Sequence, residues 1–256
     1  ITGQTGTIVA ALIPMNNKIK TTLLGGLLSA SIASPLLAGD FASPIQVVAP
    51  EAADMFSFSA GYHSTYVFRG ANFGDDLTDW SLEASKTVGS YDLTAGVWQG
   101  NVNTMGTETD FYLGASKDLG FATLDMGYIF YYFDGATAGN TQEVYLGLTK
   151  EMVGVEFSAT YFYDFDLNDT SYLELGASKT LTLAGQELDA SLTLGFDIEE
   201  TELSHVQANV SKSYDLNSAV SVTPYVSYSF AIEDNDYAGN LIDDEFVAGV
   251  SLGFSF

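Results

Sequence analysis

The segment FSFSAGYHSTYVFRG, residues 56–70, decides the fold class, because apolar and polar side chains alternate along it with a period of two. Successive side chains of a β-strand point to opposite faces, so the even-numbered aromatic residues form one face, and the other face is formed by Ser57, Ser59, His63 and Thr65. On this alternation we expect Tyr66 and Phe68 to face the apolar side and Arg69 the polar side. A strand of about ten residues with one apolar and one polar face is typical of membrane-spanning β-barrels.

A longer repeat organises the rest of the chain. The motifs LEASK, LGASK, LGLTK, LGASK and ANVSK end in lysines at positions 86, 117, 150, 179 and 212. Each interval holds a descending strand, a tight Gly-, Asn- or Asp-rich turn and an ascending strand. The pattern predicts an all-β, transmembrane, antiparallel up-and-down β-barrel of about 12 strands. The expected strands are 56–69, 79–88, 91–100, 109–118, 121–133, 142–151, 154–164, 171–180, 187–198, 204–214, 219–232 and 244–256.

The alternation also separates the charges of these strands. One parity is almost uniformly apolar, and the opposite parity collects carboxylates. A charged side chain near the bilayer midplane costs a few kcal/mol, so these acids are expected to line a wet interior. The predicted pore-lining residues are Arg69, Glu83, Asp92, Asp110, Asp125, Glu143, Glu156, Glu174, Asp189 and Glu245.

The overall charge narrows the possible partners. The chain has 33 Asp and Glu residues against 8 Lys and Arg residues. Nucleic-acid binding depends mainly on Lys and Arg, so no nucleic-acid partner is expected. Small cationic or polar solutes are favoured instead. The absence of cysteine excludes disulfides and thiolate metal sites.

Both ends of the sequence fit an exported barrel. Residues 15–38 have a basic start, a short apolar run and small residues, which predicts a Sec-type signal peptide rather than a membrane-spanning helix. Residues 1–14 are interpreted as an upstream extension and residues 39–54 as a periplasmic lead-in to a barrel at 55–256. The final strand ends on Phe256, an aromatic terminus resembling the signal read by the bacterial barrel-assembly machinery. A soluble β-sandwich explains the alternation, but neither the lysine repeat nor this terminus.

The motif Tyr66-Val67-Phe68-Arg69-Gly70 resembles the YVFRG signature of the TorF-like porins, also called the Gcw_chp family. The resemblance covers roughly residues 55–256. It implies an export signal, an outer-membrane barrel and a role in transport, and it implies no particular solute.

Arg69 is the only arginine of the chain, and two roles for it remain open. It is either a constriction or gating residue, or a structural ion pair that locks the first strand to a neighbour, because a buried charge needs a partner.

A second candidate site lies in the last long loop. Its spacing of acids resembles a calcium loop, which makes Asp234, Asp236, Asp243 and Glu245 possible Ca²⁺ ligands. Ala238 stands where Asp or Asn is expected, and the flanks are strands rather than helices.

No enzyme activity and no other cofactor are expected from the sequence. Ser204 and His205 are the only remote hydrolase pair, and their parity places them toward water rather than lipid. The function favoured is a passive, cation-preferring diffusion channel between outer-membrane lipids. The alternative is a non-conducting structural or adhesion barrel whose acidic loops bridge to partners through divalent ions.

Overall fold

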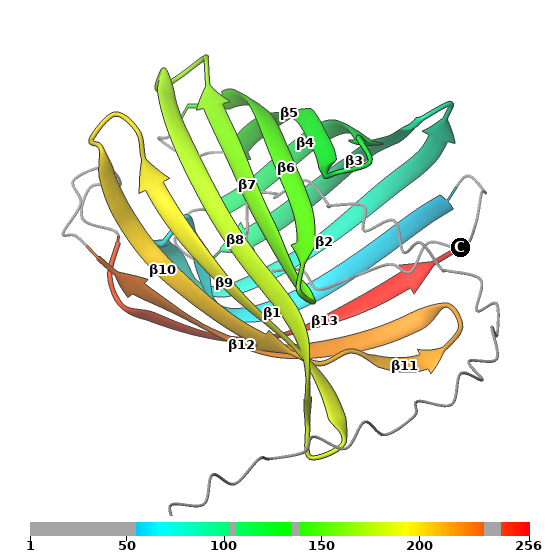
Figure 1. Ribbon diagram of the computed structural model, residues 1–256. Coiled ribbons are helices and arrows are strands. Elements are labelled where there is room, and N and C mark those ends of the chain that lie inside the picture. Colours follow the sequence, from blue (N-terminus) through cyan, green and yellow to red (C-terminus); the bar gives the residue numbers. More distant parts are fainter. Residues whose placement is uncertain (1–54, 103–105, 135–138, 233–241) are drawn as a thin grey trace, which may run out of the picture.

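The computed structural model describes residues 55–102, 106–134, 139–232 and 242–256, which form one antiparallel sheet closed into a barrel (Figure 1). The strands are β1 (Met55–Phe68), β2 (Ala71–Val88), β3 (Tyr91–Val102), β4 (Gly106–Asp118), β5 (Thr123–Asp134), β6 (Thr141–Met152), β7 (Val155–Asp164), β8 (Thr170–Leu183), β9 (Gln186–Asp197), β10 (Glu202–Ser211), β11 (Tyr214–Asn217), β12 (Val220–Ala231) and β13 (Glu245–Ser255).

Strands that are neighbours in sequence pair with each other, except β10 and β11, and two further pairings close the sheet. β1 pairs with β13, and β10 pairs with β12. The short β11 continues β10 along the same edge of β12, because Ser211 lies opposite Tyr225 and Tyr214 lies opposite Val222 in one unbroken register. Between them the Lys212 amide donates to the Pro224 carbonyl, but proline has no N–H to return the bond, which interrupts the ladder. Counting β10 and β11 as one wall strand confirms the predicted 12-strand barrel.

The two ends of the barrel differ in their connections. At one end the turns are tight: Val153–Gly154 and Ala184–Gly185 have positive φ at both positions, as in two-residue type I′ hairpins. The Phe56 and Phe256 backbones exchange hydrogen bonds at this same end. Short turns mark the periplasmic side of an outer-membrane barrel, so the opposite end is extracellular.

No helix within the described ranges is long and apolar enough to span a membrane.

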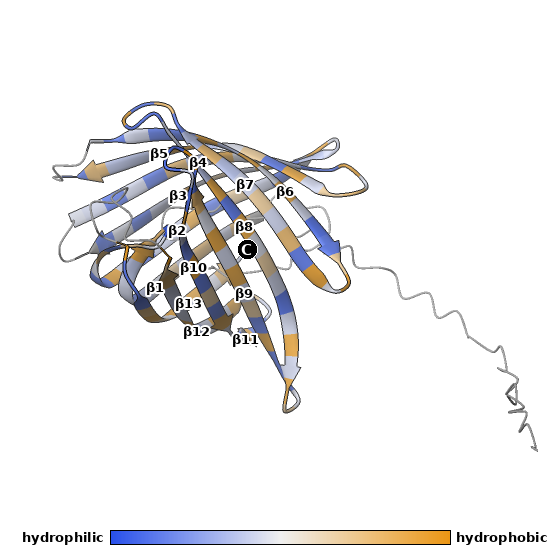
Figure 2. Cartoon of the chain, turned by 60° about the vertical axis from the view of Figure 1, so that its left-hand side comes forward, coloured by the Kyte–Doolittle hydropathy of each residue, from blue (hydrophilic) through white to orange (hydrophobic). Residues whose placement is uncertain are grey.

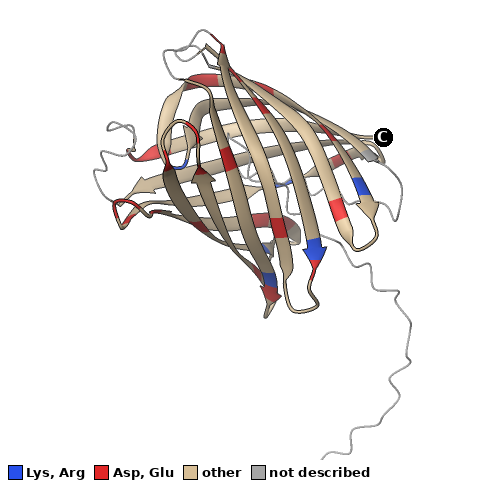
Figure 3. Cartoon of the chain, turned by 90° about the horizontal axis from the view of Figure 1, so that it is seen from above, with Lys and Arg blue, Asp and Glu red and all other residues tan. Residues whose placement is uncertain are grey.

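The wall has an apolar outer face and a polar inner face, as the alternation predicts. On β4, Phe111 and Leu113 are 50% and 59% exposed on the outside, whereas Asp110 and Tyr112, which alternate with them, are buried inside. Figure 2 shows this alternation as successive orange and blue bands along the strands. The positively charged segments gather toward strand ends, as Figure 3 shows. Lys117 and Lys212 lie over the rings of Tyr91 and Tyr214 on the periplasmic side.

The interior is not uniform along the barrel axis. In the extracellular half, two clusters of buried side chains fill the bore, one around Tyr66, Val67, Leu77, Trp98, Tyr225 and Val247, and one around Tyr112, Ile129, Tyr131, Tyr145, Phe162 and Tyr172. Phe68 packs against both clusters. In the periplasmic half, the inner face instead carries small polar residues and acids such as Ser57, Asp92, Glu156, Asp189 and Ser191, all partly exposed.

Several aromatic rings of the inner face lie over glycines of the adjacent strand. Tyr112 lies opposite Gly96, and Tyr145 lies opposite Gly127. A Cβ at Gly96 would approach the Tyr112 ring to 2.3 Å. These glycines therefore leave the space in which the rings lie flat against the wall.

The second strand differs from the prediction. Residues 70–78 were expected to form a loop, but β2 begins at Ala71, directly after the two-residue turn Arg69–Gly70. The sequence GANFGDD has the composition of a loop, yet it pairs with the end of β1 because the hairpin continues past the barrel wall.

Candidate functional site

The tip of the β1–β2 hairpin, residues 66–72 (hereafter the hairpin tip), leaves the wall and folds across the bore. β1 pairs only with β2 and β13 in the wall. Nevertheless, Arg69 at its end contacts side chains of β6, β7 and β8, on the far side of the barrel. The hairpin tip is thus a plug built from the first hairpin of the barrel.

Two local features direct the hairpin tip inward. Phe73 is an extra residue of β2, since Tyr66 pairs with Gly74 and Val67 already pairs with Asn72. Such a bulge bends and twists a strand. Arg69 and Gly70 then form the turn with φ values of 50° and 81°, the backbone of a type I′ turn. Asn or Asp normally occupies the first position of this turn, so an arginine there carries about 1–2 kcal/mol of backbone strain.

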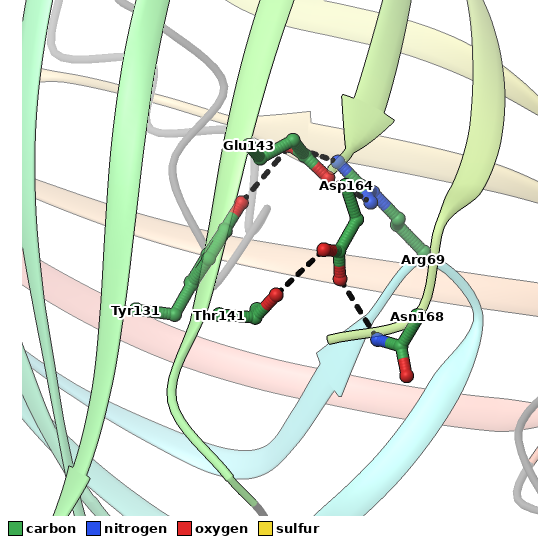
Figure 4. A network of polar contacts seen from close by, with 6 residues as sticks. All are labelled: Arg69, Tyr131, Thr141, Glu143, Asp164 and Asn168. Atoms are coloured by element: carbon green, nitrogen blue, oxygen red, sulfur yellow. Dashed lines mark hydrogen bonds and ion pairs between the residues drawn. The ribbon is translucent and has the colours of Figure 1, made fainter. Parts of the chain in front are cut away.

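Arg69 is held at the far wall by the carboxylate of Glu143, as Figure 4 shows, and by two aromatic rings. Its Nη1 and Nη2 donate to the two oxygens of Glu143 at 2.9 and 2.8 Å. The guanidinium carbon lies 4.5 Å from the ring centre of Phe162 and 4.6 Å from that of Tyr172. The Tyr131 hydroxyl donates to the same Glu143 carboxylate at 3.1 Å. A forked ion pair between aromatic faces is among the strongest arrangements available to an arginine.

The rest of the hairpin tip is anchored all round the bore. The Tyr66 hydroxyl donates to Glu108 on β4 at 2.9 Å, and the Phe68 ring packs against Tyr131 on β5. Asn72 donates to Glu245 on β13 at 2.7 Å. A Cβ on Gly70 would lie 2.6 Å from the His205 ring on β10, so this glycine permits the close approach.

The predicted orientation of Tyr66 and Phe68 toward lipid is therefore wrong. Alternation assigns one face of a strand to lipid only while the strand belongs to the wall. After the bulge, both faces of the hairpin tip lie inside the bore, and Tyr66 and Val67 are each 1% exposed.

The prediction that Arg69 forms a structural ion pair also needs a correction, which concerns the position of its partner. The pair does not lock the first strand to a neighbouring strand, because Glu143 is on the opposite wall, 74 residues away in sequence. The role left open by the sequence thus becomes specific: Arg69 ties the hairpin tip across the bore.

The structure places the side chains of all the predicted pore-lining acids on the inner face, but in two environments. Those of the extracellular half are buried: Asp110, Glu143 and Glu174. Glu83 accepts from Tyr112, and Asp125 is buried at the boundary of the two halves. Those of the periplasmic half are partly exposed, namely Asp92, Glu156 and Asp189, and Glu245 is partly exposed beside the hairpin tip.

Not every interior acid belongs to the same kind of site. Asp164, which lies opposite Glu143 in the pairing of β6 with β7, accepts from Thr141 at 2.6 Å and from Asn168 at 2.8 Å (Figure 4), so it organises the β7–β8 loop. Asp110, by contrast, is fully buried, and neither of its carboxylate oxygens accepts a hydrogen bond from the described residues. It lies on β4 directly opposite Tyr131.

The aromatic partners of Arg69 were not singled out in the sequence. Phe162 and Tyr172 have the inner-face parity of their strands, which a strict alternation count would have marked as unusual for large aromatic residues. Nothing in the sequence links them to position 69.

The other candidate sites are only partly described. Asp234 and Asp236 of the possible calcium loop lie outside the described residues, as do the predicted signal peptide and the whole of the lead-in. Asp243 is exposed, and Glu245 is bonded to Asn72. Within the described ranges, no group of three or more His, Asp or Glu side chains could hold a metal ion. The Ser204 hydroxyl lies 3.0 Å from His205 Nδ1, and both residues are buried inside the barrel.

Comparison with known proteins identifies the family of the chain. Residues 48–238 match a family described as "Bacterial protein of unknown function (Gcw_chp)". The chain belongs to the Gcw_chp family. The matched span includes the YVFRG motif, so the resemblance drawn from the sequence is confirmed. No curated protein sequence matches this member of the family.

Solved structures similar to this Gcw_chp protein are outer-membrane barrels. The COG4313 outer-membrane channel from Pseudomonas putida F1 is 10% identical, with a TM-score of 0.50 over 81% of this chain and 97% of that chain. The KdgM porin in complex with disordered oligogalacturonate is 11% identical, with a TM-score of 0.47 over 79% and 99%. Outer-membrane phospholipase A from Escherichia coli is 14% identical, with a TM-score of 0.49 over 79% and 90%. At these identities the likeness concerns the fold, which is that of a porin-like barrel of the bacterial outer membrane.

Proposed function

We propose that this protein is a constricted outer-membrane channel that prefers small cationic or polar solutes. The observation that carries the proposal is the charge of the inner face, where carboxylates recur at every level and the only arginine of the chain is already bound to Glu143. Wet clefts lined by one sign of charge concentrate counter-ions, and rings of Asp and Glu favour cations in other channels.

The two halves of the bore have different parts in this proposal. The periplasmic half, with Asp92, Glu156 and Asp189 among small polar residues, is an acidic vestibule that raises the local concentration of cations. The extracellular half, filled by the hairpin tip and the two aromatic clusters, is the constriction. Passage then depends on movement of the hairpin tip, and Arg69 is the residue that holds it.

The test is the reversal potential and single-channel conductance of the refolded protein in a planar bilayer under a potassium chloride gradient. We expect a small, cation-preferring conductance for the wild type and a larger one for Arg69→Ala. Lys117→Gln is the matched control, because Lys117 lies over Tyr91 at the periplasmic end of β4, away from the constriction. An anion-preferring conductance would contradict the proposal.

The filled extracellular half also supports a second candidate, a non-conducting structural or adhesion barrel. In that role, the acidic extracellular loops would bridge to partners through divalent ions, and Arg69 would only stabilise the fold. A folded wild type and a folded Arg69→Ala variant that both remain silent in the bilayer would establish this alternative over the channel.

The remaining partners follow from the location. Outer-membrane lipid contacts the apolar outer face, and the barrel-assembly machinery engages the final strand through Phe256. The proposal involves neither catalysis nor a cofactor, since diffusion through a charged bore requires neither.

A further inference from the structure

The surroundings of Arg69 have the chemistry of a ligand site. Glu143 offers two oxygens to two N–H groups at 2.9 and 2.8 Å, and Phe162 and Tyr172 offer ring faces at 4.5 and 4.6 Å from the guanidinium carbon. Forked hydrogen bonds and aromatic faces together recognise a planar guanidinium, whereas a compact ammonium cannot form the fork. We call Glu143, Phe162 and Tyr172 the guanidinium cage.

The guanidinium cage belongs to the wall and not to the hairpin tip. Its members lie on β6, β7 and β8 and are held by other wall residues. Glu143 accepts from Tyr131, and the Phe162 ring packs between Tyr145 at 5.9 Å and Tyr172 at 6.2 Å. The cage is therefore expected to keep its shape when the arginine is removed. A buried carboxylate left without its cation is unfavourable, so an empty cage attracts another cation.

A second observation points to a cationic ligand in the same region. The Asp110 carboxylate is fully buried, and neither oxygen accepts a hydrogen bond from the described residues. It lies on β4 opposite Tyr131, whose hydroxyl contacts the cage carboxylate. The region around Arg69 thus holds a second buried carboxyl group whose oxygens have no hydrogen-bond donor in the part of the chain that the structure describes, and a ligand that carries several N–H donors can supply one.

We propose that the guanidinium cage is a binding site for soluble guanidinium compounds, and that Arg69 occupies it as a tethered ligand. An alkylguanidinium that enters the cage displaces Arg69 and releases the hairpin tip. The inference deepens the proposed channel function by naming a class of solute, and it rests on that function only for the passage step.

The experiment uses Arg69→Asn, which removes the guanidinium and keeps the turn. Asn followed by Gly is the preferred pair for a type I′ turn, so the change also relieves the backbone strain at position 69. Thermal unfolding of the detergent-folded variant is followed with added methylguanidinium and, at equal ionic strength, with methylammonium. We expect methylguanidinium to raise the Tm of R69N by about 3 °C near saturation, and methylammonium to have a much smaller effect.

Two further variants keep the test decisive. R69N combined with Glu143→Gln should lose the response, because the fork has no carboxylate. If R69N does not fold, Arg69→Lys takes its place, since lysine fills the cage without a fork and methylguanidinium competes with it. Equal responses to the two cations in the folded variant would overturn the inference.

A conductance measurement on R69N separates this inference from the proposed function. Block of the open channel by methylguanidinium supports both. A Tm response in a barrel that never conducts supports the cage and rejects the channel. A conducting R69N that gives no selective Tm response rejects the cage and leaves the channel standing.

Discussion

The two halves of the bore are built from the same twelve-strand wall, but the interior side chains are buried in one half and partly exposed in the other. In the extracellular half, Tyr66, Tyr112 and Phe162 are at most 3% exposed, and Arg69 is paired across the lumen. In the periplasmic half, acids such as Asp92 and Asp189 stand partly exposed among serines. The difference teaches that an alternating barrel strand specifies only inside and outside. Side-chain size and the path of one hairpin decide whether the inside is a core or a vestibule.

The largest expected effect is a difference in stability between two Glu→Gln variants, one in the extracellular half and one in the periplasmic half. Glu143→Gln removes the counter-charge of Arg69 inside an aromatic cage, so the free energy of unfolding should fall by about 3 kcal/mol. Glu156→Gln changes a partly exposed vestibule acid and should cost no more than about 0.5 kcal/mol. Urea titration of both variants folded in lipid vesicles measures the contrast. Equal losses would mean that the halves are not distinct.

A pair of glycines tests the packing difference. A Cβ at Gly127 would lie 2.4 Å from the Tyr145 ring and 2.5 Å from the Leu113 carbonyl oxygen. Gly127→Ala should therefore destabilise the barrel by about 1–3 kcal/mol through overpacking. At Gly147, the nearest atom is the Thr160 hydroxyl at 3.1 Å, so Gly147→Ala should cost less. The same urea titration compares them, and an equally tolerated Gly127→Ala would argue against a tightly packed extracellular half.

Removing the charges of the vestibule should change ion selectivity more than it changes the stability of the barrel. Changing Asp92, Glu156 and Asp189 together to Asn, Gln and Asn removes three partly exposed inner-face charges and keeps a side-chain oxygen at each position. We expect the reversal potential under a potassium chloride gradient to move toward zero while the urea midpoint hardly changes. If the variant prefers cations as strongly as the wild type does, selectivity arises in the constriction and not in the vestibule.

The smallest expected effect is a response to salt. Exposed charges are screened once the Debye length falls to about 3 Å at 1 M salt, whereas buried pairs are screened much less. High potassium chloride should therefore weaken cation preference, while the stability difference between wild type and Glu143→Gln stays nearly constant. A difference that vanished with salt would place the Arg69–Glu143 pair in contact with bulk water.

Much of this protein follows from its sequence. Alternation with a period of two, the recurring lysines and the turn residues define the barrel, its strand number and the inner position of the acids. These features are local and repetitive, and a one-residue slip would expose every carboxylate of a strand to lipid, so the register is strongly specified.

The tertiary structure alone decided what the first hairpin does. The sequence marks YVFRG as distinctive and Arg69 as in need of a partner, but it does not indicate that the strand leaves the wall after Tyr66. That path depends on a one-residue bulge in β2 and on contacts with Glu143, Phe162 and Tyr172 across the bore. Periodicity describes each strand against its neighbours. It carries no information about which side chains meet once the closed sheet brings opposite walls face to face.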